Sequence, residues 1–169
     1  MRALIIGYGS PIRGDDAIGP LAADRLAAMD LPPDITVQAR HILTAELVDD
    51  LRQVERVIFL DAAADSAPGE VRCRPLAPDP SAPSTMAHFH DPRELLAWCD
   101  TLYGHHPQAW LVTAGGADFG YANYRLSPLA EQALTRMLQQ VLELLEFEQG
   151  HSSSLGEAAV AGVQEGPRY

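Results

Sequence analysis

Short apolar runs alternate along this chain with segments of helical periodicity, and this alternation strongly constrains the fold. An apolar run closed by glycines predicts a buried parallel strand, because a strand covered on both faces needs apolar side chains throughout. The predicted strands are RALIIGY (2–8), DITVQAR (34–40), RVIFLDAA (56–63), GEVRCRPL (69–76, edge type) and AWLVTAGG (109–116). The predicted helices are GPLAADRLAAM (19–29), TAELVDDLRQV (44–54), DPRELLAWCDTL (91–102) and SPLAEQALTRMLQQVLELLEF (127–147). We therefore expect a three-layer α/β fold, with a mostly parallel, twisted sheet of about five strands and helices on both faces.

The length and composition are those of one globular domain. The chain has 169 residues, of which 47% are apolar and 21% charged, which is enough to bury a core. The helical periodicity ends at Phe147, and no sustained pattern follows it. We expect one α/β domain over residues 1–147 and a flexible C-terminal tail over residues 148–169.

The charge and the cysteine content exclude several classes of protein. The formal net charge is −11, which disfavours nonspecific binding to nucleic acid or to anionic membranes, because both require basic surfaces. No run is long and apolar enough to span a bilayer, and the N-terminus lacks a signal-peptide pattern, so a cytoplasmic protein is expected. Cys73 and Cys99 have no C-x-x-C spacing, so neither a disulfide framework nor a cysteine zinc site is expected.

The stretch GYGSPIRGDDAIGP (7–20) joins the first predicted strand to the first predicted helix. Its glycines are spaced G-x-G-x-x-x-x-G, which differs from the dinucleotide-binding spacing G-x-G-x-x-G, and no G-K-[ST] ending follows. The carboxylates of Asp15 and Asp16 would also repel a phosphate at the start of the helix. A bound nucleotide is therefore not expected.

Side chains that can bind a metal ion follow the predicted strands. Asp15 and Asp16 follow the first strand, Asp61 lies near the end of the third, and His88 lies in the loop before the 91–102 helix. The carboxyl ends of parallel strands lie at one edge of the sheet, so these groups are expected to approach one another there. Two carboxylates and an imidazole suit a divalent ion such as Ni²⁺ or Zn²⁺. Each residue alone also has an ordinary explanation, as a helix cap, a loop hydrogen-bond acceptor or a surface histidine.

Four segments of the chain, in order, resemble the nickel–iron hydrogenase maturation proteases. IIGYGSPIRGDDAIGP is similar to the family's strand, G-x-G-[NS] turn and D-[DE]-x-x-G signature, and RVIFLDAA to its third strand and acid. HFHDPRELL is similar to an H-x-x-D-P segment found in some branches, and WLVTAGGADF with LSPLAEQAL to the last strand and final helix. The resemblance covers roughly Met1 to Phe147. One segment departs from the pattern, because QARHILTAEL stands where many members have a glycine-rich D-G-G-T-like segment; it resembles the branch that serves bidirectional, NAD(P)-linked hydrogenases.

The resemblance implies which residues form the site. Asp16 stands at the family's first metal-contacting acid, Asp61 at the second and His88 at the histidine, since it lies three residues before Asp91. The three together are therefore the expected catalytic and metal-contacting residues. His90 has the wrong offset and ranks second. Asp15 is expected to shape the turn, and Asp91 to cap the helix that follows it.

The activity that the resemblance implies is endopeptidase cleavage. The family removes a C-terminal peptide from the precursor of the [NiFe]-hydrogenase large subunit once nickel has been inserted. The nickel would be supplied by the substrate, and Asp16, Asp61 and His88 would complete its coordination. The residues leave two routes open for breaking the bond: the metal could polarise the carbonyl, or a carboxylate could act as general base.

Two other functional classes remain compatible with the sequence. The first is a noncatalytic, nickel-sensing chaperone that binds the large subunit without cutting it. The second is a flavodoxin-like protein that binds a small molecule. A covalent mechanism is not expected, because Ser10 and Ser84 have no evident His–Asp partners and the two cysteines lie away from the strand-end motifs.

Overall fold

The computed structural model describes residues 1–10, 14–82, 90–117 and 126–160, and it contains a five-stranded sheet with the strand order β2-β1-β3-β5-β4. The strands are β1 (Ala3–Tyr8), β2 (Ile35–Arg40), β3 (Arg56–Ala63), β4 (Val71–Leu76) and β5 (Gln108–Gly115). All neighbouring pairs are parallel except β4 and β5, which are antiparallel. The structure therefore confirms the mostly parallel sheet predicted from the sequence, including β4 as an edge strand.

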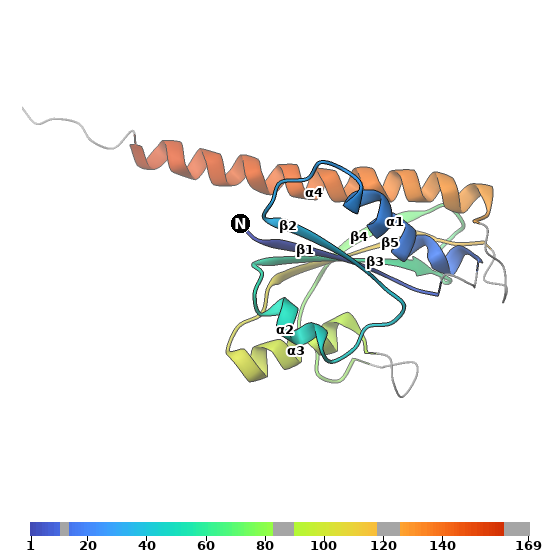
Figure 1. Cartoon of the computed structure of the whole chain (residues 1–169), viewed down its shortest axis with the longest axis horizontal. Helices are drawn as coiled ribbons and strands as arrows, with labels where there is room; N and C mark the ends of the chain where they lie inside the picture. Colours follow the sequence, from blue (N-terminus) through green and yellow to red (C-terminus); the bar gives the residue numbers. More distant parts are fainter. Residues whose placement is uncertain (11–13, 83–89, 118–125, 161–169) are drawn as a thin grey trace, which may run out of the picture.

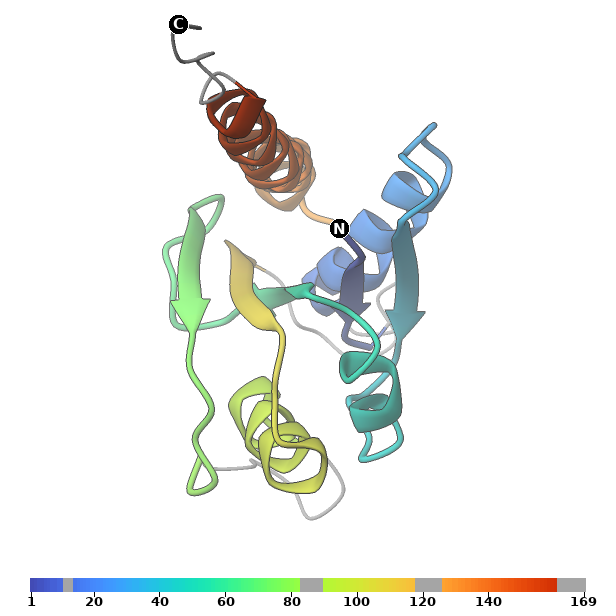
Figure 2. The ribbon, with the colours of Figure 1, turned by 90° about the vertical axis from the view of Figure 1, so that its left-hand side faces the viewer.

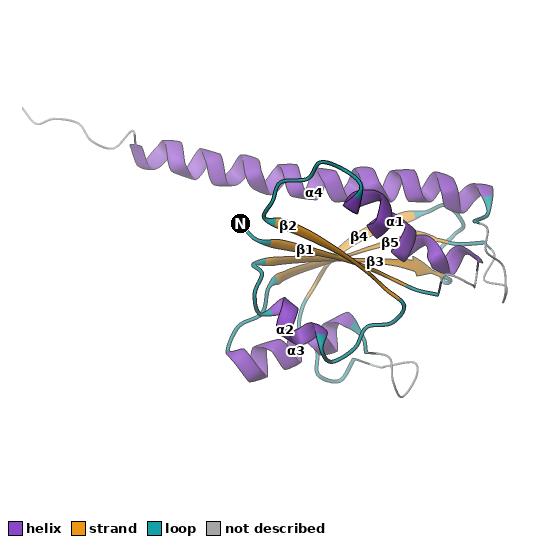
Figure 3. Ribbon diagram, viewed as in Figure 1, coloured by secondary structure: helices purple, strands orange, loops and turns teal. Residues whose placement is uncertain are grey.

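Helices cover both faces of this sheet. The helices are α1 (Ile18–Ala27), α2 (Leu47–Leu51), α3 (Pro92–Tyr103) and α4 (Pro128–Val160), and a 3-10 turn, η1 (Gly14–Ala17), precedes α1. α1 and α4 lie on one face, and α2 and α3 lie on the other (Figure 1, Figure 3). A view turned by 90° shows the same three layers, with the sheet between the two helix layers (Figure 2).

The core is divided by the sheet into two clusters. Ile5 and Ile58 point towards α1 and α4, whereas Leu4, Ile6 and Phe59 point towards α2 and α3. Successive side chains of a strand point to opposite faces, so an unbroken apolar run supplies both clusters at once. This explains why the central strands read as continuous apolar segments in the sequence.

Two helices begin at the caps that the sequence predicts. Asp91 accepts a hydrogen bond from the Arg93 amide at 2.8 Å at the start of α3, with Pro92 as the first helical residue. Ser127 accepts one through Oγ from the Ala130 amide at 3.2 Å at the start of α4. Such caps satisfy backbone N–H groups that have no partner within the helix.

The last helix is longer than the sequence suggests. The periodicity predicts an end at Phe147, but α4 continues to Val160 and extends past the edge of the sheet (Figure 1). The segment 148–160 contains two glycines and three serines and has no sustained apolar period, so neither helix propensity nor periodicity predicts this extension. That residues 148–169 form a flexible tail outside the domain stays a prediction.

None of the described helices, α4 included, combines the length and the hydropathy that a membrane-spanning helix requires.

Candidate functional site

The candidate site lies where the chain reverses its direction across the sheet. From β1 the chain passes through α1 to β2 on one side, and from β2 it passes through α2 to β3 on the other side of β1. α1 and α2 lie on opposite faces, so the carboxyl ends of β1 and β3 form a topological switch point, where α/β folds commonly bind ligands. Asp16 follows β1 in η1, and Asp61 lies near the end of β3.

The glycines of the first turn let backbone segments approach closely here. Gly9 has φ +146°, and a β-carbon at this position would overlap the carbonyl oxygen of Asp16. A β-carbon at Gly19 would overlap the carbonyl oxygen of Tyr8 and lie 2.6 Å from that of Leu60, so α1 can start directly against β1 and β3 only with glycine there. The glycine pattern thus has a steric explanation in the folded chain.

The carboxylate of Asp16 is held by the same turn. The amide of Ser10 donates a hydrogen bond to Asp16 Oδ2 at 2.8 Å. Asp16 is partly exposed, while Ser10 and Asp15 are buried. The turn therefore fixes one oxygen of Asp16 and leaves the side chain accessible at the carboxyl edge of the sheet.

The carboxylate of Asp61 lies close to that of Asp16, and its protonation is strongly perturbed. Removal from water and the negative charge of Asp16 raise the pKa of Asp61 to about 7. The Ala62 amide, which donates to Asp61 Oδ1 at 2.8 Å, and the hydroxyl of Tyr8 act in the opposite direction and lower this pKa. Burial and the charge of Asp61 also raise the pKa of Tyr8, so this phenol stays protonated at neutral pH.

This pair can perform two kinds of chemistry. Two neighbouring carboxylates repel each other, and a divalent cation between them would relieve that repulsion. A carboxyl group that titrates near neutral pH is also matched to accept and return a proton in a reaction at that pH. Within the described ranges, no group of three or more metal-binding side chains is arranged to hold an ion, so Asp16 and Asp61 supply only part of the predicted ligand set.

The third predicted site residue, His88, lies outside the described residues. The residues that follow it approach Tyr8, which adjoins Asp61. Asp91 is close enough to Tyr8 for its charge to raise the pKa of that phenol, and Tyr8 in turn contacts Asp61. The amide of His90 donates to the Leu43 carbonyl at 3.4 Å, which anchors this end of the loop.

His90 packs against α3, and its Nδ1 is buried without a hydrogen-bond partner in the described part of the chain. Its ring lies edge-on to Trp98 with 4.8 Å between the ring centroids, and its Nδ1 lies 3.4 Å from a carboxylate oxygen of Glu94. Both partners are on α3, one and two turns along the helix. The second rank that the sequence gives His90 stays a prediction.

The sequence does not reveal two features of the site. One is the contact between Tyr8 and Asp61. The position of Tyr8 between two glycines does not indicate that it has a partner on another strand. The other is the partner of Asp15, which accepts hydrogen bonds from Ser127, 112 positions further along the chain. No local signal in the sequence points to a partner at that separation.

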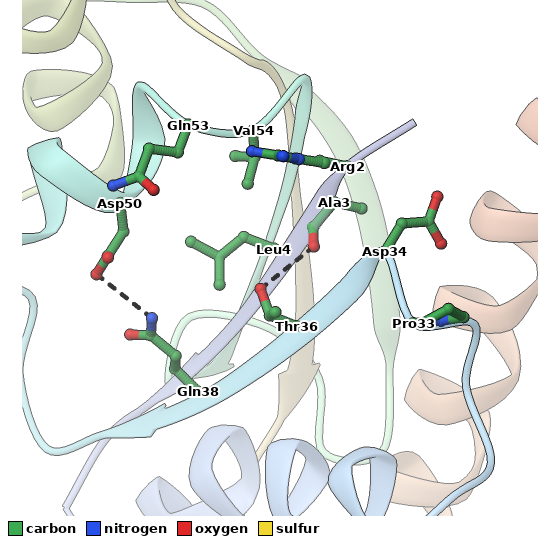
Figure 4. A pocket seen from close by; sticks show the side chains of 10 residues that line it. All are labelled: Arg2, Ala3, Leu4, Pro33, Asp34, Thr36, Gln38, Asp50, Gln53 and Val54. Carbon is green, nitrogen blue, oxygen red and sulfur yellow. Dashed lines mark hydrogen bonds between the residues drawn. The ribbon is translucent and has the colours of Figure 1, made fainter.

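A hollow of about 380 Å³ lies at the opposite end of the strands (Figure 4). Its lining comes from the start of β1, from β2 and from the end of α2, and it includes Arg2, Thr36, Gln38 and Asp50. Gln38 and Asp50 are joined across it by a hydrogen bond of 3.3 Å. None of its lining residues belongs to the carboxyl edge, so it is separate from the candidate site.

Comparison with protein-family models and with curated protein sequences gives no match. Comparison with solved structures gives several. A [NiFe] hydrogenase maturation protease, HycI, from Thermococcus kodakarensis has 25% identity and a TM-score of 0.69, over 86% of this chain and 92% of its own. The hydrogenase maturating endopeptidase HybD from E. coli has 24% identity and a TM-score of 0.72, over 88% of this chain and 94% of its own.

A third similar structure is the hydrogenase 2 maturation peptidase from a Thaumarchaeota archaeon. It has 24% identity and a TM-score of 0.66, over 86% of this chain and 99% of its own. All three are named as proteases, peptidases or endopeptidases, which supports the expectation of a hydrolase. The structural neighbours of this chain are thus [NiFe] hydrogenase maturation proteases, as the resemblance in the sequence implies.

Proposed function

We propose that this chain is an endopeptidase that removes a C-terminal peptide from the precursor of a [NiFe]-hydrogenase large subunit. The observation that carries the proposal is the pair of neighbouring carboxylates, Asp16 and Asp61, at the switch point of a fold shared with hydrogenase maturation proteases. The proposed place of action is the cytoplasm.

The proposed basis of selectivity is recognition of nickel that the precursor already holds. In this proposal the nickel belongs to the substrate. Asp16 and Asp61 offer carboxylate oxygens at one edge of the sheet, and His88 would add an imidazole from the segment that leads to α3. A site of few ligands binds a free ion weakly and gains affinity when a partner supplies the remaining ligands. Cleavage would then be confined to loaded precursor.

The chain's own contribution to bond cleavage is proton transfer. In the hydrolysis, a water molecule attacks the scissile carbonyl, the C–N bond breaks, and the proton from water passes to the leaving amine. Asp61, whose pKa is about 7 in the free chain, is suited to accept that proton near neutral pH. Nickel in the substrate would polarise the carbonyl as a Lewis acid.

The test compares two forms of one precursor. The purified chain is incubated with nickel-loaded and with nickel-free large-subunit precursor from the same cell, and the products are weighed by mass spectrometry. Loss of a C-terminal peptide from the loaded form alone is the expected result. Equal cleavage of both forms would contradict recognition through nickel. Binding of the loaded precursor without any cleavage would favour the chaperone instead.

A further inference from the structure

Asp15 is the most deeply buried of the buried polar and charged residues in the described chain, with an exposed fraction of 0%. Its Oδ1 accepts a hydrogen bond from the Ser127 amide at 2.8 Å. Its Oδ2 accepts from the Ala117 amide at 2.7 Å and from the Ser127 hydroxyl at 2.8 Å. A buried carboxylate is stable when such donors replace the water that it has lost.

The donors come from the two ends of one connection. Ala117 lies just after β5, and Ser127 caps α4. One carboxylate therefore joins three segments that are far apart in the sequence: the η1 turn, the end of β5 and the start of α4. Asp15 fixes the positions of these segments relative to one another.

The next residue along the turn is Asp16. η1 has only four residues, so a displacement of the Asp15 backbone also displaces Asp16. The carbonyl of Asp16 is in contact with Gly9, and its carboxylate accepts from the Ser10 amide, so the turn has little room to adjust. The position of Asp16 thus depends on the anchor at Asp15.

We propose that Asp15 is a positioning residue, which holds Asp16 in place by joining its turn to Ala117 and Ser127. The effect of Asp15 on the reaction rests on the proposed function. The coupling between the Asp15 turn and the start of α4 does not depend on it. Asp15 makes no contact with substrate in this scheme and acts only through Asp16.

A carboxylate is required because the groups described around it are donors. In an Asp15→Asn variant, one oxygen becomes an NH₂ group. At the Oδ1 position this group would face the Ser127 amide, and at the Oδ2 position it would face the Ala117 amide. In both orientations one backbone N–H loses its acceptor, so the anchor loosens while the shape of the side chain is kept.

The test uses the exchange rate of the Ser10 amide, which bonds to Asp16 and not to Asp15. Amide hydrogen exchange is followed by NMR in the full chain. We expect Asp15→Asn and Ser127→Ala each to speed exchange at Ser10 about tenfold, although Ser127 is more than a hundred positions away. Ser127→Thr keeps both the hydroxyl and the amide and should leave the Ser10 rate unchanged.

A matched control excludes a general loss of stability. Thr135→Ala removes a side-chain bond of 3.3 Å to the Glu131 carbonyl on the same helix, without touching Asp15. If Thr135→Ala speeds exchange at Ser10 as much as Ser127→Ala does, the proposal is wrong. It is also wrong if Ala117 and Ser127 exchange faster in the Asp15→Asn chain while Ser10 does not.

A second readout follows the reaction. Asp15→Asn should lower kcat/KM for nickel-loaded precursor about tenfold or more and should reduce the ratio of affinities for loaded over nickel-free precursor. A purely structural role would lower the folded fraction but leave that ratio unchanged. A wild-type chain that does not distinguish the two precursors would overturn recognition through nickel, and the Ser10 exchange rate would still decide whether Asp15 positions Asp16.

Discussion

The β1–α1 turn and the end of β3 each hold a buried or partly buried aspartate, in opposite chemical settings. Asp15 is fully buried and accepts hydrogen bonds from two backbone amides and one hydroxyl. Asp61 accepts one from the Ala62 amide, contacts the Tyr8 hydroxyl and faces the charge of Asp16. The donors around Asp15 stabilise a charge, whereas the surroundings of Asp61 oppose one and raise its pKa to about 7.

The difference shows how one sheet edge can separate structural from reactive carboxylates. A carboxylate surrounded by donors gains nothing further from a metal ion or a proton, and it serves as an anchor. A carboxylate that is desolvated and close to a like charge is stabilised by binding either a metal ion or a proton. Asp16 belongs with Asp61 in this comparison, because it is partly exposed and contributes the charge that perturbs Asp61.

The largest expected effect is on cleavage, and it separates Asp16 from ordinary acidic residues. Asp16→Ala removes the carboxylate whose charge raises the pKa of Asp61 and should reduce the rate of precursor cleavage by about a thousandfold. The measurement is the rate of product formation from nickel-loaded precursor, followed by mass spectrometry. Asp24→Ala is the matched control, because Asp24 is an exposed residue of α1 that carries the same charge. Normal processing by the Asp16→Ala chain would contradict the assignment of Asp16 to the site.

The next effect is on stability, and it tests the role of Asp15 as an anchor. Asp15→Ala leaves the Ala117 amide, the Ser127 amide and the Ser127 hydroxyl without an acceptor that is itself fully buried. The free energy of unfolding should fall by about 3 kcal/mol, measured by urea denaturation at pH 7. A fall of less than about 1 kcal/mol would show that water or rearranged neighbours satisfy these donors.

Asp61 should behave in the opposite way, because its charge is unfavourable in the folded chain. Its folded pKa of about 7 lies above the ordinary value of 3.8, so the folded chain binds more protons than the unfolded chain between these values. Stability is therefore lost as the pH rises from about 4 to about 7, and the full penalty is present above pH 7. Asp61→Asn should raise the free energy of unfolding by about 2 kcal/mol at pH 8 and by almost nothing near pH 4.

Paired urea titrations of wild-type and Asp61→Asn chains at the two pH values check this expectation. Groups that both chains share cancel in the difference between them. Asp24→Asn gives the matched loss of one exposed carboxylate and should show no such dependence on pH. An Asp61→Asn chain that is less stable than wild type at pH 8 would mean that the carboxylate is held favourably, as Asp15 is.

The sequence predicts the sheet well because its signals are local. The apolar runs that become β1, β3 and β5 are continuous, and the caps at Asp91 and Ser127 are set by the residues that follow them. The length of α4 is missed because apolar periodicity reports burial against the sheet, and this helix continues past Phe147 without such a pattern. Periodicity marks the packed part of a helix rather than its end.

Only part of the candidate site can be predicted from the sequence, because some of its contacts join residues that are far apart in the chain. Parallel topology alone brings the ends of β1 and β3 to one edge, so the proximity of Asp16 and Asp61 follows from strand order. The distinction between Asp15 and Asp16 requires the fold, because it depends on donors at Ala117 and Ser127 that no spacing near the aspartates reveals. The assignment of His88 rests on the resemblance and stays a prediction.

The smallest expected effect is the dependence of precursor binding on pH, and it concerns the protonation of Asp61. A proton on Asp61 and a nickel ion in the precursor compete for the same oxygens, so protonation of Asp61 should weaken binding of loaded precursor. With a pKa of about 7, the dissociation constant should rise about tenfold between pH 8 and pH 6. Calorimetric or fluorescence titration of loaded precursor at the two pH values measures the change.

The titration with nickel-free precursor separates this effect from pH changes elsewhere in the interface, because that form offers no ion for Asp61 to contact. The same tenfold change with both precursors would place the titrating group outside the nickel contact. Asp61→Asn should bind loaded precursor more weakly than wild type at pH 8 and should lose most of its dependence on pH. If the dependence persists in that variant, the proton that opposes binding belongs to another residue, and the contrast between Asp61 and Asp15 would concern stability alone.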